Sequence, residues 1–256
     1  MKKYVFLFLV FIPIIFNSCT TAPSRMPVCA PAPIHSRPAA MSVMRQNVKH
    51  IVAPGETLWR ISKMYDVPVS DIVNANQLKD ASTVSMGQSL LIPKAAPLRS
   101  VIPLYPNSKW KFIIIHHSAT EKGDSLTFNR HHLKRGFTGG VGYHFVIDNG
   151  THGKVDGQIE VAPRWLKQQD GRHCKASSMN CRAIGICLVG NFNEESVSAE
   201  QMKSLVSLVH VLCHYYKIPL RNVMGHGQVS GANTDCPGKR FPWQEFNRRL
   251  GMRPPV

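Results

Sequence analysis

The sequence predicts an α/β fold in which helices flank a mixed central sheet, preceded by a small βααβ module. Three apolar runs indicate strands of the larger part, at residues 113–115, 143–148 and 182–192. β-Branched side chains are frequent in these runs, and they suit a buried sheet. An amphipathic helix follows within residues 198–217. Ser198 and Gln201 form a capping box at its start. Alternating strands and helices are typical of an α/β domain.

Length and charge restrict the class of protein. The chain has 256 residues, enough for one sizeable domain and a smaller one. It carries 31 Lys and Arg against 15 Asp and Glu, a net charge of +16. Such a balance favours an anionic partner. Because the charge is spread out, without an arginine-rich run, we expect a polyanionic surface as the partner and no nucleic acid.

The first residues indicate export. Lys2 and Lys3 precede an apolar stretch, residues 4–16, which is too short to span a bilayer and fits a secretory signal. The stretch ends at "FNSC", which resembles the lipobox of bacterial lipoproteins. The resemblance implies that residues 1–18 are removed and that Cys19 becomes a lipidated N-terminus. We therefore expect an envelope protein anchored to a membrane by its lipid, at the outer membrane and facing the periplasm.

Two Pro- and Ala-containing spacers, residues 19–47 and 95–109, enclose a compact segment, residues 48–94. Within this segment a short strand meets a Pro-Gly turn, and Thr57 offers an N-cap for the first of two short helices. The run "SLLIP" closes the segment as a strand. The pattern predicts a small βααβ module with no catalytic residues of its own.

This module resembles a LysM domain through "PGETLWRIS", "YDV", "IVNANQL" and "GQSLLIP". The resemblance implies binding to glycans that contain N-acetylglucosamine, chiefly peptidoglycan. It also implies that Gly55, Glu56, Thr57 and residues 77–81 line the glycan groove.

The larger part contains histidines and a cysteine whose side chains are common metal ligands. The isoleucine strand ends at His116 and His117, while His226 and Cys236 lie in the glycine-rich loops "GHG" and "TDCPG", with nine residues between them. One strand-end histidine with His226 and Cys236 would give three ligands and an open fourth position, the pattern of catalytic zinc. Because neighbouring strand residues face opposite ways, only one of the two histidines is expected to face the site.

Residues 110–250 resemble the zinc-dependent N-acetylmuramoyl-L-alanine amidase family, which includes phage amidase lysozymes and peptidoglycan recognition proteins. The motifs that carry the resemblance are "IIIHHSAT", "GVGYHFVID", "DGRHCK", "AIGICLVGNF", "GHGQV" and "TDCPG". The resemblance selects His116, with His226 and Cys236, as ligands of one catalytic Zn²⁺. It leaves His117 to packing or to support of the site.

The same resemblance assigns further roles. Tyr143 matches the catalytic tyrosine, Thr234 matches the polar residue two positions before the cysteine ligand, and His173 matches a candidate substrate contact. One branch of the family has a glutamate base in the third strand, where this sequence has Cys187. A proton acceptor other than glutamate must therefore serve, and Tyr143 is the candidate; it could also orient the water or pass a proton to the leaving amine.

The implied reaction is hydrolysis of the amide bond between N-acetylmuramic acid and L-alanine by a zinc-activated water. The implied partners are peptidoglycan or muropeptides, and a monomer is expected. The alternatives are a non-catalytic peptidoglycan-binding or recognition lipoprotein, and a structural tether of the cell wall.

Of the five remaining cysteines, Cys29 lies in the first spacer and the other four divide into two groups. Cys174 and Cys181 share a polar loop, and an oxidising compartment predicts a local disulfide between them. Cys187 and Cys213 fall in apolar runs and are expected to be buried thiols.

Lipidation of Cys19 can be measured directly. Radiolabelled palmitate should be incorporated into the wild-type protein, because the short apolar stretch and the Ser18–Cys19 junction match the signal. Equal labelling of a Cys19→Ala variant would show that the lipid, if present, is attached elsewhere.

Overall fold

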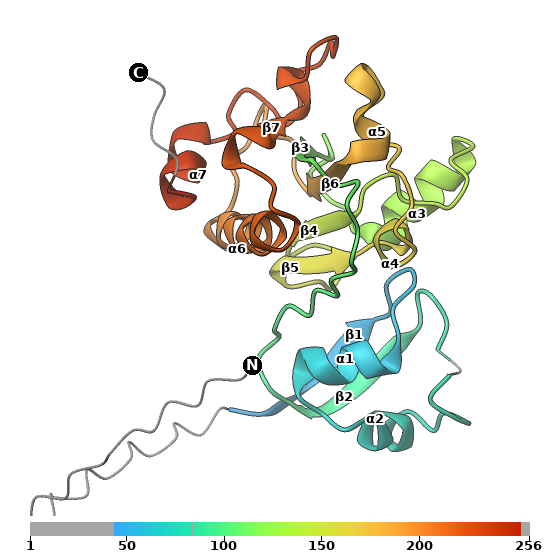
Figure 1. Cartoon of the computed structure of the whole chain (residues 1–256). Helices are drawn as coiled ribbons and strands as arrows, with labels where there is room; N and C mark the ends of the chain where they lie inside the picture. Colours follow the sequence, from blue (N-terminus) through green and yellow to red (C-terminus); the bar gives the residue numbers. More distant parts are fainter. Residues whose placement is uncertain (1–43, 83, 252–256) are drawn as a thin grey trace, which may run out of the picture. The chain divides into compact units, whose positions relative to one another are not determined.

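The computed structural model describes residues 44–82 and 84–251 (Figure 1). The signal stretch, Cys19 and most of the first spacer lie outside the described residues. Among the described residues, no helix has the length and apolarity needed to cross a membrane.

The predicted small module is present as β1 (Gln46–Ile51), α1 (Leu58–Tyr65), α2 (Val69–Ala75) and β2 (Ser89–Ala95). The two strands pair antiparallel. Thr57 caps α1, since its side chain accepts a hydrogen bond from the Arg60 N–H. Buried residues from both helices and β2, among them Ile61, Ile72, Leu90 and Ile92, form one small core, and the partly buried Val48 of β1 packs against it. The predicted βααβ order is therefore confirmed.

The larger part is built on a five-stranded mixed sheet in the order β5-β4-β6-β3-β7. Its strands are β3 (Phe112–His117), β4 (Phe145–Asn149), β5 (Asp156–Val161), β6 (Ala183–Leu188) and β7 (Val223–Gly225). All neighbours are parallel except β4 and β5, which pair antiparallel. The α/β fold with a mixed central sheet, predicted from the sequence, is confirmed.

Helices and short 3₁₀ turns lie between these strands and after the last of them. The helices are α3 (Ser125–Lys134), α4 (Pro163–Leu166), α5 (Met179–Arg182), α6 (Ala199–Tyr216) and α7 (Trp243–Arg249), and the 3₁₀ turns are η1 (Ala176–Ser178), η2 (Leu220–Asn222) and η3 (His226–Gln228). The longest helix, α6, begins with the predicted capping box of Ser198 and Gln201. Its C-terminal cap, Lys217, adopts a left-handed conformation.

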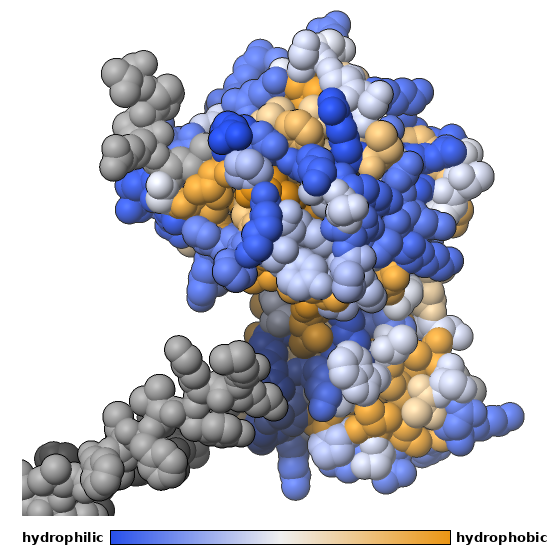
Figure 2. All heavy atoms as spheres, in the orientation of Figure 1, coloured by the Kyte–Doolittle hydropathy of each residue, from blue (hydrophilic) through white to orange (hydrophobic). Residues whose placement is uncertain are grey.

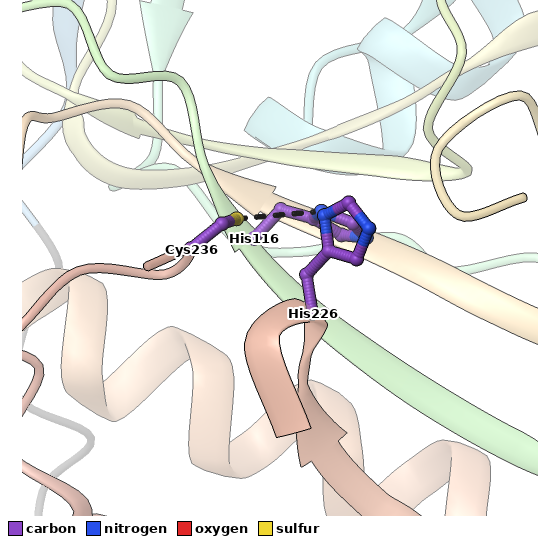
Figure 3. Close-up of side chains that lie close together, drawn as sticks. All are labelled: His116, His226 and Cys236. Atoms are coloured by element: carbon purple, nitrogen blue, oxygen red, sulfur yellow. Dashed lines mark hydrogen bonds between the residues drawn. The ribbon is translucent and has the colours of Figure 1, made fainter. Parts of the chain in front are cut away.

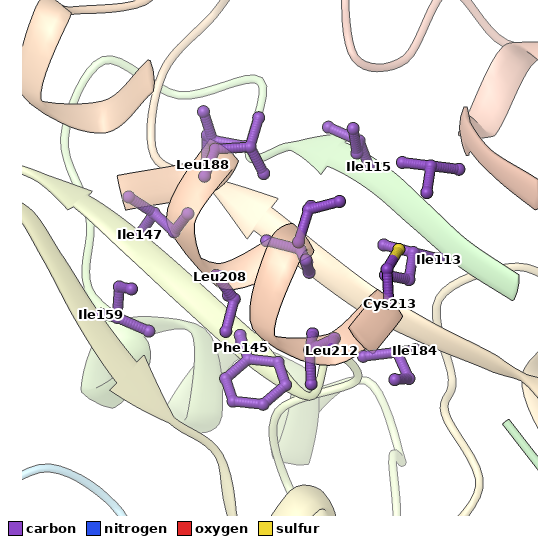
Figure 4. Close-up of a cluster of buried hydrophobic side chains, with 14 of the residues drawn as sticks. Ile113, Ile115, Phe145, Ile147, Ile159, Ile184, Leu188, Leu208, Leu212 and Cys213 are labelled. Atoms are coloured by element: carbon purple, nitrogen blue, oxygen red, sulfur yellow. The ribbon is translucent and has the colours of Figure 1, made fainter. Parts of the chain in front are cut away.

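Side chains of the sheet alternate between two faces. Ile113 and Ile115 belong to the main core, where Leu208 and Leu212 of α6 pack on the sheet (Figure 4). Ile114 points the other way, into a second cluster. All three isoleucines are fully buried, and burial of such a side chain contributes about 1.5–3 kcal/mol to stability. β3 is therefore a rigid central support.

The surface in Figure 2 is of mixed character: hydrophilic residues predominate, with apolar residues between them. A few large apolar side chains are exposed singly, such as Trp59 at 62% and Leu133 at 49%. Isolated exposed apolar residues are normal on soluble proteins. We therefore assign no binding role to them.

The cysteines correct one prediction. Cys174 is buried in the cluster that contains Ile114, whereas Cys181 is exposed, and both are free thiols. One sulfur lies in the core and the other in solvent, so the predicted Cys174–Cys181 disulfide is wrong. Cys187 and Cys213 are buried, as predicted. Burial raises the pKa of the Cys213 thiol to about 11 and that of Cys187 well above its usual value.

A cluster of buried charges lies at β4 and β5. The Lys154 ammonium pairs with the Glu160 carboxylate at 2.6 Å, and each side chain is only 1% exposed. Asp148 is fully buried nearby. Burial raises the pKa of Asp148 well above its usual value, the Glu160 carboxylate raises it further, and Lys154 opposes both effects. The Asp148 carboxyl is therefore held in its neutral form in the folded protein.

Asp148→Asn tests this protonation state. A carboxyl whose pKa is raised on folding stabilises the protein below its unfolded pKa, and that stability is lost as the pH rises through the folded pKa. Asparagine cannot ionise. As the pH rises from 5 to 9, the free energy of unfolding of the wild type should therefore fall relative to that of the variant, by up to ~1.4 kcal/mol per pH unit. Urea unfolding at each pH measures this. A difference that stays constant with pH would mean that Asp148 does not titrate as inferred.

Candidate metal centre and the adjoining cavity

Three separate segments bring the predicted metal donors together. His116 is near the end of β3, His226 directly follows β7, and Cys236 lies in the loop before α7. Their donor atoms all lie within 4.8 Å of one another (Figure 3). Because β3 and β7 are parallel neighbours, their carboxyl ends meet at one edge of the sheet, which is where open α/β sheets bind ligands.

The spacing of these donors fits zinc. The His116 Nδ1 atom is 3.5 Å from the Cys236 Sγ atom. Two tetrahedral ligands at the usual Zn–N and Zn–S bond lengths are about 3.6 Å apart. His116 is 2% exposed and Cys236 is 8% exposed, so solvent does not compete for either donor. Two imidazoles and a thiol are also a donor set that zinc prefers.

The protonation states of the donors follow from burial. Burial lowers the pKa of His116 well below its usual value, and the neighbouring His173 and His226 lower it further. Burial also lowers the pKa of His226. Both imidazoles are therefore neutral, as a metal ligand must be. Burial raises the pKa of the Cys236 thiol to about 12, so metal uptake must release a proton from this group.

His117 lies on the opposite face of β3. It follows His116, so strand alternation turns it toward the core side occupied by Ile113 and Ile115. Its Nδ1 atom accepts a hydrogen bond from the Phe192 N–H at 3.2 Å. His117 does not belong to the donor group formed by the described residues. The structure thus places His116 at the site and His117 in packing.

Glycines let the two ligand loops approach each other. The Gly227 N–H donates to the Cys236 carbonyl at 2.7 Å. A Cβ atom at position 227 would lie 2.3 Å from the Thr234 carbonyl oxygen, and one at position 225 would lie 2.7 Å from the Pro237 ring. Both contacts are too short for any side chain. The glycines of "GHG" therefore allow the loop that carries His226 to pack against the loop that carries Cys236.

A cavity of about 810 Å³ adjoins the donors, and His226, Tyr143 and His173 line it. The Tyr143 ring centroid is 5.2 Å from that of His116. Burial raises the pKa of Tyr143 well above its usual value, and the nearby Cys187 raises it further. The Tyr143 hydroxyl is therefore protonated and can act as a proton donor.

Thr234 stands apart from the cavity lining. Its side chain is exposed, and its hydroxyl oxygen accepts a hydrogen bond from the Cys236 N–H at 3.2 Å. Because that oxygen is the acceptor, its hydrogen is still able to point toward a ligand.

Three cations were not singled out in the sequence. Arg135, Arg172 and Lys175 line the same cavity, and its lining among the described residues contains no acidic side chain. Arg135 and Arg172 both lie over the Phe137 ring, at 5.3 and 5.7 Å from its centroid. Arg172 and Lys175 belong to the motif "DGRHCK" together with His173. Their position next to a predicted substrate contact is the sequence feature that could have identified them.

The predicted glycan-binding residues of the small module differ in accessibility. Gly55 and Thr57 are exposed, whereas Glu56 is 7% exposed. The Glu56 carboxylate accepts a hydrogen bond from the Ala53 N–H at 2.9 Å and pairs with His50 at 2.8 Å. Although burial opposes it, the interactions with His50 lower the pKa of Glu56 to about 2. Glu56 thus has partners within its own module. Residues 77–81 are largely exposed.

Comparison with known families adds to this geometry. The model of the N-acetylmuramoyl-L-alanine amidase family matches residues 106–239, more than half of the chain. The chain belongs to this family. A LysM domain model matches residues 50–93. Both modules predicted from the sequence are therefore present, while their boundaries at 48–94 and 110–250 stay predictions. The family membership supports peptidoglycan hydrolysis as the general activity.

Solved structures similar to the amidase domain include two from Clostridium intestinale. The endolysin amidase LysCS is 34% identical, with 57% of this chain and 86% of that chain covered and a TM-score of 0.48. The amidase LysC is 34% identical, with 59% and 92% covered and a TM-score of 0.49. Drosophila PGRP-LB is 22% identical, with 57% and 85% covered and a TM-score of 0.44. No curated protein sequence matches the chain.

Substitution of single donors tests the metal centre. His116→Ala and Cys236→Ala should each lose bound zinc, because two remaining ligands hold the ion far less tightly than three. His117→Ala is the matched control on the same strand and should retain zinc, since its side chain faces the core. Metal content after loading and dialysis measures this, with circular dichroism to verify folding. Loss of zinc in His117→Ala with retention in His116→Ala would reverse the assignment of the two faces of β3.

Proposed function

We propose that this protein hydrolyses the amide bond between N-acetylmuramic acid and the L-alanine of the peptidoglycan stem peptide. We further propose that the amidase uses one zinc ion held by His116, His226 and Cys236. The observation that carries the proposal is the group of two neutral imidazoles and one thiol within 4.8 Å, bordering a cavity through His226. Three protein ligands beside a cavity leave a position for substrate or water, as in catalytic zinc sites.

Zinc in such a site supplies a nucleophilic hydroxide at neutral pH and polarises the scissile carbonyl. The protein supplies the remaining groups. The leaving amine of L-alanine must gain a proton, and Tyr143 is a protonated donor in the cavity wall. The hydroxyl of Thr234 is the proposed hydrogen-bond donor to the oxyanion that develops on the carbonyl. At position 187, where one branch of the family has a glutamate, the buried Cys187 belongs to the cluster against which Tyr143 packs.

The charge of the cavity suits this substrate. Stem peptides carry free carboxylates, and Arg135, Arg172 and Lys175 give the cavity a positive lining. Cationic lining concentrates an anionic substrate and orients it. The net charge of +16 acts in the same direction over longer distances, because cell-wall polymers are rich in anionic groups.

The LysM module and the lipid complete the proposal. We propose that the module binds the glycan strands and so raises the local concentration of substrate around the amidase domain. We also propose that a lipid on Cys19 tethers the protein to an envelope membrane, at the outer membrane and facing the periplasm. The N-terminal sequence pattern is the support for this location. A monomer suffices, because all proposed catalytic groups come from one chain.

Digestion of purified peptidoglycan tests the activity. Mass spectrometry should find free stem peptides that begin with L-alanine and glycan strands with intact lactyl groups. Activity should disappear on removal of zinc and return on its addition. Sacculus binding without any release of peptides would instead support a non-catalytic recognition protein.

Tyr143→Phe separates proton transfer from metal binding. The variant should retain zinc, because the tyrosine is no donor to the ion, while kcat should fall by a factor of about 10²–10⁴, as for loss of an acid–base group. Phenylalanine preserves the ring that packs near His116. Release of stem peptides from soluble muropeptides measures kcat, and unchanged turnover would exclude Tyr143 from proton transfer.

Ala81→Trp tests the LysM module. The exposed Ala81 lies within residues 77–81, so an indole there should obstruct the proposed glycan groove. Pelleting with insoluble sacculi should become weaker, whereas cleavage of soluble muropeptides should be unchanged. Ser70→Trp, an exposed site on α2 outside the proposed groove, is the control of equal bulk. Equal pelleting of Ala81→Trp, Ser70→Trp and wild type would show that residues 77–81 do not contact glycan.

A further inference from the structure

His173 forms a chain of hydrogen bonds that ends at the metal centre. Its Nδ1 atom is 3.0 Å from His116 Nε2, and its Nε2 atom is 3.3 Å from the Ala183 carbonyl oxygen. His173 is 9% exposed. The other ring nitrogen of His116, Nδ1, is the one that faces the Cys236 sulfur at 3.5 Å. His173 therefore contacts the ring nitrogen of His116 that points away from Cys236.

This chain permits one arrangement of protons. A carbonyl oxygen only accepts, so His173 Nε2 must carry a hydrogen and donate it to Ala183. In a neutral imidazole the other nitrogen then has a lone pair, so His173 Nδ1 accepts a hydrogen bond from His116 Nε2–H. His116 is neutral as well and carries its hydrogen on Nε2. Its lone pair is consequently on Nδ1, directed toward the side of Cys236.

The surroundings of His173 hold the ring in this place. A Cβ atom at Gly171 or Gly185 would lie 2.3 or 2.4 Å from His173 Cδ2, so both positions exclude any side chain. The backbone N–H of His173 donates to Asn180 Oδ1 at 2.8 Å. Gly185 lies on β6 and pairs with Ile114 of β3, two residues before His116. The cradle of His173 and the strand of His116 thus form one rigid unit.

We propose that His173 is a positioning residue that fixes the tautomer and ring orientation of His116 for metal binding. This deepens the proposed function, and it rests on the zinc centre and not on the bond that the protein cleaves. Hydrogen-bond partners of metal-ligating histidines typically change metal affinity by about 10–100-fold. The sequence resemblance implied a role for His173 in substrate contact alone, and the hydrogen bond adds a role in the metal site.

A pair of variants distinguishes positioning from simple packing. In His173→Asn, the side-chain oxygen takes nearly the place of Nδ1 and can still accept from His116, whereas His173→Leu fills the space and accepts nothing. Competition with a chromophoric chelator measures zinc affinity. We expect His173→Leu to bind zinc about 10–100-fold more weakly than wild type, and His173→Asn to regain most of that loss. The visible absorption of bound Co²⁺ should be altered in His173→Leu and close to wild type in His173→Asn.

His132→Asn is the matched control. His132 lines the same cavity, and its Nδ1 accepts from the Gly142 N–H at 3.0 Å, so this variant removes an imidazole without touching the His116 chain. Its zinc affinity should equal that of wild type. Wild-type zinc affinity in His173→Leu, or equal losses in His173→Asn and His173→Leu, would overturn the proposal.

Nitrogen-15 NMR of the metal-free wild-type protein provides a test that does not depend on the folding of a variant. His116 should carry its hydrogen on Nε2, and a hydrogen on Nδ1 would overturn the proposal. Failure of the positioning role and failure of the proposed amidase activity would give different results. Weak zinc binding in His173→Leu, together with no cleavage of peptidoglycan by wild type, would refute the amidase activity and leave the positioning role intact.

Discussion

The side chains of β3 alternate between two faces of the central sheet, and the arrangement of the metal centre follows from this alternation. One face carries Ile113, Ile115 and His117 toward the main core, and the other carries Ile114 and His116 toward the cavity side. The strand lies between β6 and β7, so it cannot shift its register without breaking both ladders. A slip by one residue would exchange the two histidines and place Ile114 in the wrong cluster. The apolar core and the metal donor are thus specified together.

The metal centre also requires that several chain segments approach β3 and one another closely. Gly225 and Gly227 bring the two ligand loops together, and Gly171 and Gly185 make room for the ring of His173. These glycines belong to different motifs of the sequence but serve one site. A side chain at any of these positions would collide with a group that positions a donor. Close packing here leaves little freedom to the donors, as preorganised metal sites require.

Burial affects the two polar regions of the amidase domain in different ways. At the metal centre burial keeps the imidazoles and the Tyr143 hydroxyl neutral. It also raises the pKa of the Cys236 thiol, so this thiol ionises only when a cation binds. At β4 and β5 it keeps Asp148 neutral beside the Lys154–Glu160 pair. In the first case a metal ion can take the place of a proton on sulfur. In the second the ammonium already balances the charge, so that region is structural.

The sequence by itself determined the fold class, the two modules and the residue types of the metal centre, because periodicity, capping residues and glycine motifs are local properties. Strand alternation reduced His116 and His117 to one site residue, and the family resemblance selected His116. The pairing of β3 with β6 and β7 shows the physical reason, because it fixes which face of the strand meets the core. The sequence could not exclude a Cys174–Cys181 bridge, because the burial of one sulfur and the exposure of the other depend on packing around α5. Nor could it place Arg135 and Arg172 in one cavity or His173 against His116, since these residues meet only after β3, β6 and their loops have packed. Contacts between distant segments are properties of the tertiary structure, and they complete the site that the motifs begin.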